Sequence, residues 1–385
     1  MADLELLIDS EIVGAADGFS SLGRVKTFDG RALCAEQLGS ADVLLVRSVS
    51  KVDRTLLKNS RVRFVGTATS GVDHIDAFDL EEDGITVCSA AGCNARAVAE
   101  HVICCAFLYA DRIGRAVSSL SLGVLGFGHV GKALTDLASG LFREVVIRDP
   151  LKSAADLTLP CASMEELLSQ DIVSLHVPLT KDGEHPTFHL IDEKALGRMH
   201  ESALLINAAR GGVIDERCID GQSGAVNSLW LAIDCWEDEP EVRTNTLSRS
   251  WLATPHIAGH SLEARARASE MMFQSVRQWA GLESVGAKGF APADAGKSVL
   301  ATVTRIEDAL ASVYDLGGHT QRLKVFPQIA AASRPAYFYD CRKQWGLRRE
   351  FSHYALDWEP GVKDFSVGRR LGFSDGKVRD RVGWT

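Results

Sequence analysis

The stretch that decides the fold lies in the first half of the chain and reads Leu122-Gly123-Val124-Leu125-Gly126-Phe127-Gly128-His129-Val130-Gly131. Its first four residues are mainly apolar and predict a buried strand, whereas the residues after Val130 have the apolar spacing of a helix. Between a strand and a helix, Gly126 permits a tight turn, Gly128 lets backbone amides approach a pyrophosphate, and Gly131 lets the helix pack on the sheet. The helix N-terminus attracts the phosphate charge. The stretch therefore predicts a dinucleotide-binding turn that includes His129 and Val130.

A carboxylate follows this turn at the position that distinguishes the two nicotinamide dinucleotides. Asp149 stands eighteen residues after Gly131, at the end of the next predicted strand, Glu144–Arg148. There it can accept hydrogen bonds from the adenosine ribose hydroxyls, and it repels a 2′-phosphate. We therefore expect NAD rather than NADP as the cofactor. Arg148, beside the aspartate, leaves the strictness of that preference open.

Short apolar runs alternate with helical stretches on both sides of the glycine-rich turn. Four runs in the first hundred residues, at 4–8, 43–47, 62–66 and 85–88, are nearly uniformly apolar, as in parallel strands covered on both faces. A second series contains six runs: Ser121–Gly126, Glu144–Arg148, Ile172–His176, Ala203–Asn207, Leu229–Asp234 and Trp251–Thr254. Helices are expected from Asn94 onward and from 261 to 280. The pattern predicts an α/β protein with a Rossmann-type NAD domain and a flavodoxin-like α/β substrate domain.

Length and charge narrow the class of protein. A chain of 385 residues with 46% hydrophobic and 24% charged residues is too long for one compact core, so two or three domains are expected. A net charge of −9 argues against nucleic acid as a partner. The one markedly basic stretch, Arg342–Arg349, is typical of a solvated or subunit-facing surface.

The cysteines and the apolar segments indicate the compartment. Nine cysteines form an odd set without a Cys-x-x-Cys pair, so neither a disulfide framework nor a metal site is expected. The N-terminus lacks the pattern of a signal peptide. The most apolar window, Ala97–Ala110, is too short to cross a bilayer and contains Glu100 and His101. We expect a cytoplasmic protein without membrane association.

Three polar side chains follow predicted strands at the ends where open α/β sheets bind ligands: Arg210, Glu239 and His256. Oxidation of an α-hydroxy acid needs a base, a cation for the carboxylate and a partner that tunes the base. Histidine suits the base because its unperturbed pKa is about 6.5, and a neighbouring carboxylate would raise that pKa. Glu237 competes with Glu239 for this pairing. Other histidines lack ligand spacing and are expected on the solvated surface, among them His185, His189 and His200.

From about residue 4 to about residue 280, the chain resembles the D-isomer-specific 2-hydroxyacid dehydrogenase family. The resemblance is carried by Leu-Gly-Phe-Gly-His-Val-Gly at 125–131, Asn-Ala-Ala-Arg-Gly-Gly-Val-Ile-Asp at 207–215 and Thr-Pro-His-Ile-Ala-Gly-His at 254–260. It implies that Arg210 binds the substrate carboxylate and oxo group, and that His256 is the acid/base. It also favours Glu239 over Glu237, because the family's glutamate immediately precedes a proline. By the same resemblance, three further residues contact NAD: Val177, Asp234 and Gly259.

Segments at 46–52, 66–74, 91–95 and 341–351 resemble a branch of this family that oxidises a phosphorylated four-carbon hydroxy acid. Arg47, Ser48 and Lys51 offer two cations and a hydroxyl after a strand, which suits a phosphate, although an exposed turn has the same pattern. The resemblance places Thr69, and the amides of Ser70 and Gly71, against the substrate. His260 stands where relatives carry a substrate-facing tyrosine. The expected substrate-binding residues are therefore Arg47, Ser48, Thr69, Ser70, Gly71 and His260.

We expect a substrate-binding domain at 1–95 and 258–284, a NAD-binding Rossmann domain at 96–257, and a smaller C-terminal α+β dimerisation domain at 285–385. The resemblance of the C-terminal part implies a homodimer, and the expected partner is a small phosphorylated hydroxy acid. Two alternatives stay open. One is a dehydrogenase of another D-2-hydroxy acid, such as 3-phosphoglycerate, and the other is an NAD-sensing interaction protein that resembles transcriptional corepressors.

Overall fold

The computed structural model describes residues 4–157, 159, 161–220, 228–282, 284–286, 289–290, 298–344, 348–359 and 365–376. The chain divides into two compact units, which we call the first and the second unit. The first contains Met1–Asn94 and Ser261–Ala295, and the second contains Ala95–His260 and Gly296–Thr385. The division into three functional domains with the boundaries expected above stays a prediction.

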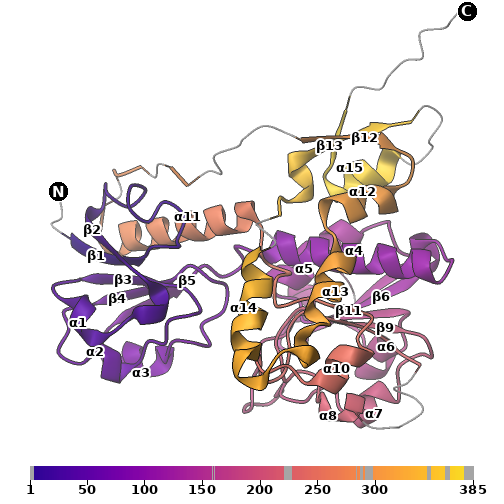
Figure 1. The fold of residues 1–385 in the computed structure, drawn as a ribbon, viewed down its shortest axis with the longest axis horizontal. Coiled ribbons are helices and arrows are strands. Elements are labelled where there is room, and N and C mark those ends of the chain that lie inside the picture. The colour runs from indigo at the N-terminus through magenta and orange to yellow at the C-terminus, as the bar shows by residue number, and fades with distance from the viewer. Residues whose placement is uncertain are drawn as a thin grey trace, which may run out of the picture. The chain divides into compact units, whose positions relative to one another are not determined.

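The first unit is built on a five-stranded parallel sheet with the order β2-β1-β3-β4-β5. This is the strand order of flavodoxin-like folds, as the sequence predicts. Its strands are β1 (Leu4–Asp9), β2 (Gly23–Phe28), β3 (Val43–Val46), β4 (Phe64–Thr67) and β5 (Thr86–Ser89). One face packs on the long helix α11 (Leu262–Trp279), and the other is covered by α1 (Ala35–Leu38), α2 (Arg54–Leu57) and α3 (Ala77–Glu82) (Figure 1).

The second unit contains a six-stranded parallel sheet with the order β11-β10-β9-β8-β6-β7. Its strands are β6 (Ser121–Leu125), β7 (Glu144–Arg148), β8 (Ile172–Leu175), β9 (Leu204–Asn207), β10 (Trp230–Ile233) and β11 (Leu252–Ala253). The strand order reverses between β6 and β8, which is where Rossmann folds bind dinucleotides. Its helices are α4 (Ala95–Arg112), α5 (His129–Ala138), α6 (Met164–Leu168), α7 (Glu193–Leu196), α8 (Arg217–Asp220) and α10 (Thr244–Arg249).

The C-terminal part belongs to the second unit and mixes helices with a three-stranded parallel sheet, β12-β13-β14. Its elements are β12 (Ser298–Val303), α12 (Ile306–Val313), α13 (Leu316–Leu323), α14 (Arg334–Gln344), β13 (Tyr354–Trp358), α15 (Phe365–Leu371) and β14 (Ser374–Asp375). The hydroxyl of Thr320 on α13 accepts a hydrogen bond from the Ala253 amide of β11 at 3.0 Å. The C-terminal elements are thus joined directly to the edge of the large sheet.

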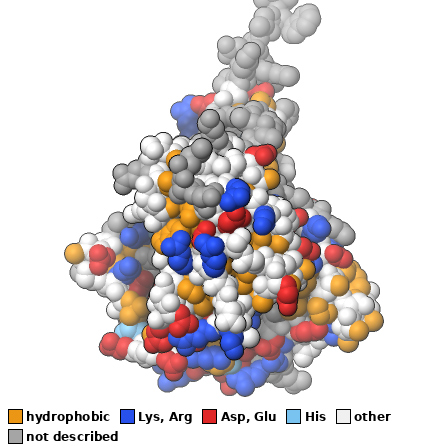
Figure 2. Space-filling view, turned by 90° about the vertical axis from the view of Figure 1, so that its left-hand side faces the viewer, with side chains coloured by type: hydrophobic (Ala, Val, Ile, Leu, Met, Phe, Trp, Pro, Cys, Tyr) orange, Lys and Arg blue, Asp and Glu red, His pale blue; other side chains and the backbone are white. Residues whose placement is uncertain are grey.

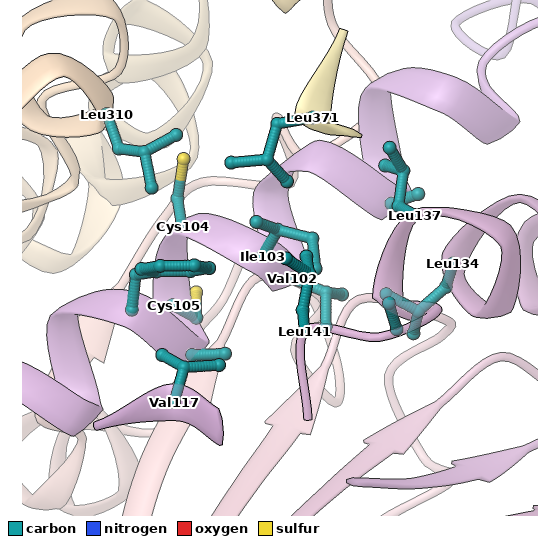
Figure 3. Close-up of a cluster of buried hydrophobic side chains, with 14 of the residues drawn as sticks. Val102, Ile103, Cys104, Cys105, Val117, Leu134, Leu137, Leu141, Leu310 and Leu371 are labelled. Carbon is teal, nitrogen blue, oxygen red and sulfur yellow. The ribbon is translucent and has the colours of Figure 1, made fainter. Parts of the chain in front are cut away.

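Helix α4 is the centre of the core in the second unit. Figure 3 shows Val102, Ile103, Cys104 and Cys105 on this helix, in one cluster with Leu134 and Leu137 of α5 and with Leu310 and Leu371 of the C-terminal part. Because α4 is apolar nearly all round, it is buried against the sheet and against the C-terminal elements at once. Burial of such side chains contributes about 1.5–3 kcal/mol each.

The outer face drawn in Figure 2 mixes basic, acidic and hydrophobic side chains without a continuous basic surface on that side. Several of the exposed charges pair locally, as when Arg54 contacts Asp79, Glu82 and Asp83. Pairs of this kind contribute little to stability because water screens them. Within the described ranges, no helix combines the length and the apolar composition needed to cross a bilayer.

Candidate active site

The glycine-rich turn connects β6 to α5 as the sequence predicts. Gly126 has a φ of 95°, and a Cβ atom there would lie 2.6 Å from the carbonyl oxygen of His176. At Gly131, a Cβ atom would lie 2.1 Å from the carbonyl oxygen of Gly126. Neither position accepts a side chain. Gly128, in contrast, faces open space and precedes the helix without a side-chain cap on its amides. These uncapped amides fit a dinucleotide pyrophosphate.

Four other residues expected at the cofactor lie around this turn. Helix α5 begins at His129, which is exposed, and Val130 is partly buried beside it. A Cβ atom on Gly126 would also meet Cγ1 of Val177, so Val177 borders the turn from the end of β8. Asp149 accepts hydrogen bonds from the Phe127 amide at 2.8 Å and from the Leu151 amide at 3.1 Å. Its carboxylate is thereby fixed beside the glycine turn.

Replacing Asp149 by serine should raise the KM for NAD and bring the KM for NADP closer to it. The loss of the carboxylate removes a hydrogen-bond acceptor for the ribose hydroxyls. It also removes the repulsion of a 2′-phosphate, and the two effects together contribute about 1–3 kcal/mol to the preference for NAD. Steady-state kinetics with both dinucleotides measure the ratio of the two KM values. Asp156, an exposed aspartate in the following 3₁₀ turn, gives a matched control on replacement by serine. An unchanged NAD to NADP ratio in the Asp149 variant would remove this residue from the cofactor site.

The three loops that follow β9, β10 and β11 are bound to one another by side chains at the strand ends. The amide of Asn207 donates to the carbonyl oxygens of Arg210 and Cys235, at 3.0 and 3.1 Å. The indole of Trp236 donates to the carbonyl oxygen of Thr254 at 2.8 Å. The loops with Arg210, Glu239 and His256 are therefore one connected structure. Asn207 begins the motif at 207–215, but this positioning role was not predicted from the sequence.

Asp234 holds the turn that carries His256. Its side chain is buried, and its two carboxylate oxygens accept from the Thr254 hydroxyl at 2.6 Å and from the amides of Ile257 and Ala258, at 2.7 and 2.9 Å. His256 itself has a φ of 55°, in the left-handed region that costs a non-glycine residue about 1 kcal/mol or more. The converging hydrogen bonds stabilise this conformation. The expected contact of Asp234 and Gly259 with NAD stays a prediction.

His256 is paired with Glu239. Nδ1 of the imidazole lies 2.5 Å from Oε1 of the carboxylate, and the other oxygen, Oε2, accepts from the Trp236 amide at 3.1 Å. About a third of the His256 side chain is exposed. Because Nδ1 is bound to the carboxylate, Nε2 is the nitrogen left for proton exchange with a substrate.

The environment sets the pKa values of this pair in opposite directions. Burial lowers the pKa of His256, but the interactions with the Cys235 side chain and the Glu239 carboxylate outweigh it, and the pKa lies well above the usual 6.5. Burial raises the pKa of Glu239. The interaction with His256 and a smaller effect of Arg342 lower this pKa below its ordinary value. The carboxylate thus stabilises the protonated imidazole.

Glu237 takes a different partner. Its Oε1 lies 2.7 Å from Nε2 of His189, and its amide donates to Oε1 of buried Glu216 at 2.7 Å. The prediction that His189 is solvated is wrong, because only 16% of its side chain is exposed. His189, Asp215 and Glu237 meet the spacing of metal ligands. The guanidinium of Arg217 nevertheless already contacts Asp215 and His189.

The substrate-binding residues expected in the first unit lie after β3 and β4. Arg47 forms two hydrogen bonds with the fully buried carboxylate of Asp9, at 2.9 and 3.1 Å, so its charge is largely neutralised within the unit. Ser48 is exposed. Thr69 donates to the carbonyl oxygen of Gly71 at 3.0 Å, and the Ser70 hydroxyl contacts Asn94 and the Gly92 amide.

Arg210 and His260 lie in the second unit with His256. Nη1 of Arg210 donates to the carbonyl oxygen of Ala209 at 2.7 Å. Nε2 of His260 lies 3.3 Å from Nη2 of Arg342, a residue that the sequence did not place in the site. The expected roles of these residues toward substrate stay predictions.

Comparisons with known proteins identify the family and the fold. Residues 97–258 match the family model described as D-isomer specific 2-hydroxyacid dehydrogenase, NAD binding domain. Among solved structures, D-lactate dehydrogenase from Aquifex aeolicus, complexed with NAD and lactic acid, superposes with a TM-score of 0.60 at 24% identity and covers 75% of this chain and 100% of its own. NAD-bound 3-phosphoglycerate dehydrogenase of Entamoeba histolytica gives a TM-score of 0.61 at 23% identity, covering 76% of this chain and 99% of its own. These two show the fold.

The fold and the family model define an NAD-dependent dehydrogenase, with NAD as its cofactor. Two relatives identify the family within this class of dehydrogenases. Erythronate-4-phosphate dehydrogenase of Marinobacter nauticus is 37% identical and covers 96% of this chain and 99% of its own. The enzyme of that name from Pseudomonas aeruginosa is 36% identical and covers 91% and 94%. The chain belongs to the erythronate-4-phosphate dehydrogenase family.

Proposed function

We propose that the protein oxidises 4-phospho-D-erythronate to (R)-3-hydroxy-2-oxo-4-phosphooxybutanoate with NAD, as a step in the biosynthesis of pyridoxal 5′-phosphate. Two facts support this: the similarity to erythronate-4-phosphate dehydrogenases along nearly the whole chain, and the His256–Glu239 pair on a turn fixed by Asp234. The pair is the observation that carries the proposal, because a binding protein has no need of an imidazole tuned toward proton transfer.

In the proposed mechanism, Nε2 of His256 accepts the proton of the C2 hydroxyl, and Glu239 stabilises the imidazolium that forms. Arg210 binds the substrate carboxylate and polarises the C2 oxygen as it becomes a carbonyl. NAD, when bound, would supply the acceptor for the hydride released from C2. The glycine turn at 126–131 would hold its pyrophosphate, and Asp149 would hold its adenosine ribose.

The phosphate and the carboxylate of the substrate require separate partners. We assign Arg47, Ser48, Thr69, Ser70 and Gly71 to substrate binding, as their places at the ends of β3 and β4 suggest. Replacing Arg47 and Ser48 together should then raise the KM for a phosphorylated acid far more than for the unphosphorylated one. The homodimer and the cytoplasmic location belong to the same proposal, and size-exclusion chromatography with light scattering tests the dimer.

The decisive experiment follows NADH formation with 4-phosphoerythronate, 3-phosphoglycerate, D-lactate and glycerate. Turnover of 4-phosphoerythronate with the highest kcat/KM supports the proposal. If only 3-phosphoglycerate is oxidised, the substrate assignment is wrong. NAD binding without turnover of any acid would favour an interaction protein instead.

Glu239→Gln should move the acid limb of the kcat/KM profile to lower pH. His256 accepts a proton only when neutral, so the oxidation rate rises as the pH passes through its pKa, which lies above 6.5 in the native pair. Loss of the Glu239 charge lowers that pKa, and it should also reduce the maximal kcat by about 10- to 100-fold. Glu237→Gln, which breaks the contact with His189, is the control and should leave the limb in place. An unmoved limb in the Glu239 variant would contradict the pairing.

A further inference from the structure

Arg342 reaches the catalytic cluster from the C-terminal part of the chain. It lies in α14 and belongs to the same unit as His256, Glu239 and His260. Its Nη2 is 3.3 Å from Nε2 of His260, and its buried Nε has no hydrogen-bond partner among the described residues. The expectation that the stretch Arg342–Arg349 is a solvated or subunit-facing surface did not indicate this contact.

The charge of Arg342 is not balanced by a direct ion pair. Within the described ranges, no carboxylate lies at ion-pair distance from it, whereas Arg47 is paired with Asp9 and Arg348 with Glu100. Glu239 is near enough for its pKa to respond to Arg342, after the larger effects of burial and His256. The buried Nε of this partly buried guanidinium has no hydrogen-bond partner among the described residues, and such unused hydrogen-bonding capacity is costly to leave unsatisfied.

We infer that Arg342 binds the phosphate group of the substrate, with His260 holding the guanidinium in position. The inference rests on the proposed function, because the phosphorylated acid needs a further cation for its phosphate besides Arg210 and Arg47, and the charge of Arg47 is largely offset by Asp9. A phosphate monoester carries a charge of about −1.5 to −2 at neutral pH, and the planar fork of arginine matches its oxygens. The contact with Nε2 of His260 orients Arg342, and an imidazole carries no negative charge that could neutralise the guanidinium.

The test compares Arg342→Met with Lys343→Met, which removes the same charge from an exposed neighbour on the same helix. The Arg342 variant should raise the KM for 4-phosphoerythronate about 10- to 100-fold, the factor expected for a lost charge-assisted hydrogen bond. Its kcat/KM for unphosphorylated erythronate should change less than about threefold, and the Lys343 variant should behave as wild type on both acids. Arg342→Lys should restore part of the loss, since it keeps the charge but not the fork.

A second measurement separates this inference from the proposed function. Inorganic phosphate is titrated calorimetrically into the NAD-saturated wild type and variants, which requires no turnover. Weaker phosphate binding in Arg342→Met alone supports the inference even if the wild type fails to oxidise 4-phosphoerythronate. If Arg342→Met lowers kcat/KM equally for 4-phosphoerythronate and for erythronate and displaces the pH profile, Arg342 acts only through Glu239, and the inference is wrong. Unchanged phosphate binding in this variant would also contradict the inference.

Discussion

His256→Asn is expected to lower kcat about 10²- to 10⁴-fold, the usual contribution of a positioned general base. Asparagine removes the imidazole but should keep the backbone conformation. His256 has a φ of 55°, and asparagine adopts the left-handed region more readily than most residues. The hydrogen bonds from the turn to Asp234 use backbone amides, so they should persist in the variant. NAD binding, measured by calorimetry, should be unchanged.

His200→Asn is the control for this substitution, because His200 is exposed and, among the described residues, its ring contacts the adjacent carbonyl oxygen of Glu201. Its kcat should equal that of the wild type. If His256→Asn retains more than about a third of the wild-type kcat, another group accepts the proton, and the assignment of the base in the proposed mechanism falls.

Arg348→Met should destabilise the protein by about 3–5 kcal/mol, because it leaves a buried charge without its main partner. Only 8% of the Arg348 side chain is exposed, and its Nη1 lies 2.9 Å from Oε2 of Glu100, which is fully buried. The guanidinium also lies 4.7 Å from the ring centroid of Tyr314 and donates to the carbonyl oxygen of Ala97 at 2.5 Å. Chemical denaturation measures the free energy of unfolding.

The loss of unfolding free energy in Arg348→Met should be larger at high pH than at low pH. Burial raises the pKa of Glu100 above its ordinary value, even against Arg348 and Arg96. A raised folded-state pKa favours the folded state at low pH, and that stability is lost as the pH rises through the folded pKa. Removal of Arg348 raises the pKa further, so the deficit should be larger near about pH 8 than near about pH 5.

Glu100→Gln in the Arg348→Met background is the matched test. Removing the second charge should recover part of the lost stability and most of the added pH dependence, since no buried ion then lacks its counterion. Identical unfolding free energies for the single and the double variant at both pH values would show that Glu100 does not carry the cost.

The fold was predictable where the sequence pattern is local. Strands β1, β3, β6 and β7 stand out as short apolar runs, and the glycine turn between β6 and α5 has an unambiguous context. Strand β2, Gly23–Phe28, has no counterpart among the predicted strands. It is an edge strand whose exposed residues include Arg24 and Lys26. Its composition is therefore that of a loop, and only the pairing with β1 identifies it as a strand.

The parts of the site that escaped prediction depend on residues distant in sequence. Glu100 and Arg348 are 248 positions apart, so the basic stretch near the C-terminus gave no sign that one of its arginines is buried. His189 lies 48 positions from Glu237, and Arg342 lies 82 positions from His260. The contact between His256 and Glu239 could be predicted because the two residues follow consecutive strands, whose ends adjoin in a parallel sheet.

The way in which Asp234 holds the catalytic turn has a consequence for how the family can diverge. The carboxylate binds the amides of Ile257 and Ala258 and the hydroxyl of Thr254, and none of these hydrogen bonds involves residue 260. The side chain at 260 can therefore be exchanged without removing any of the hydrogen bonds that hold the turn at His256. A change at 260 would act on the expected substrate contact and would leave the proposed proton acceptor in place.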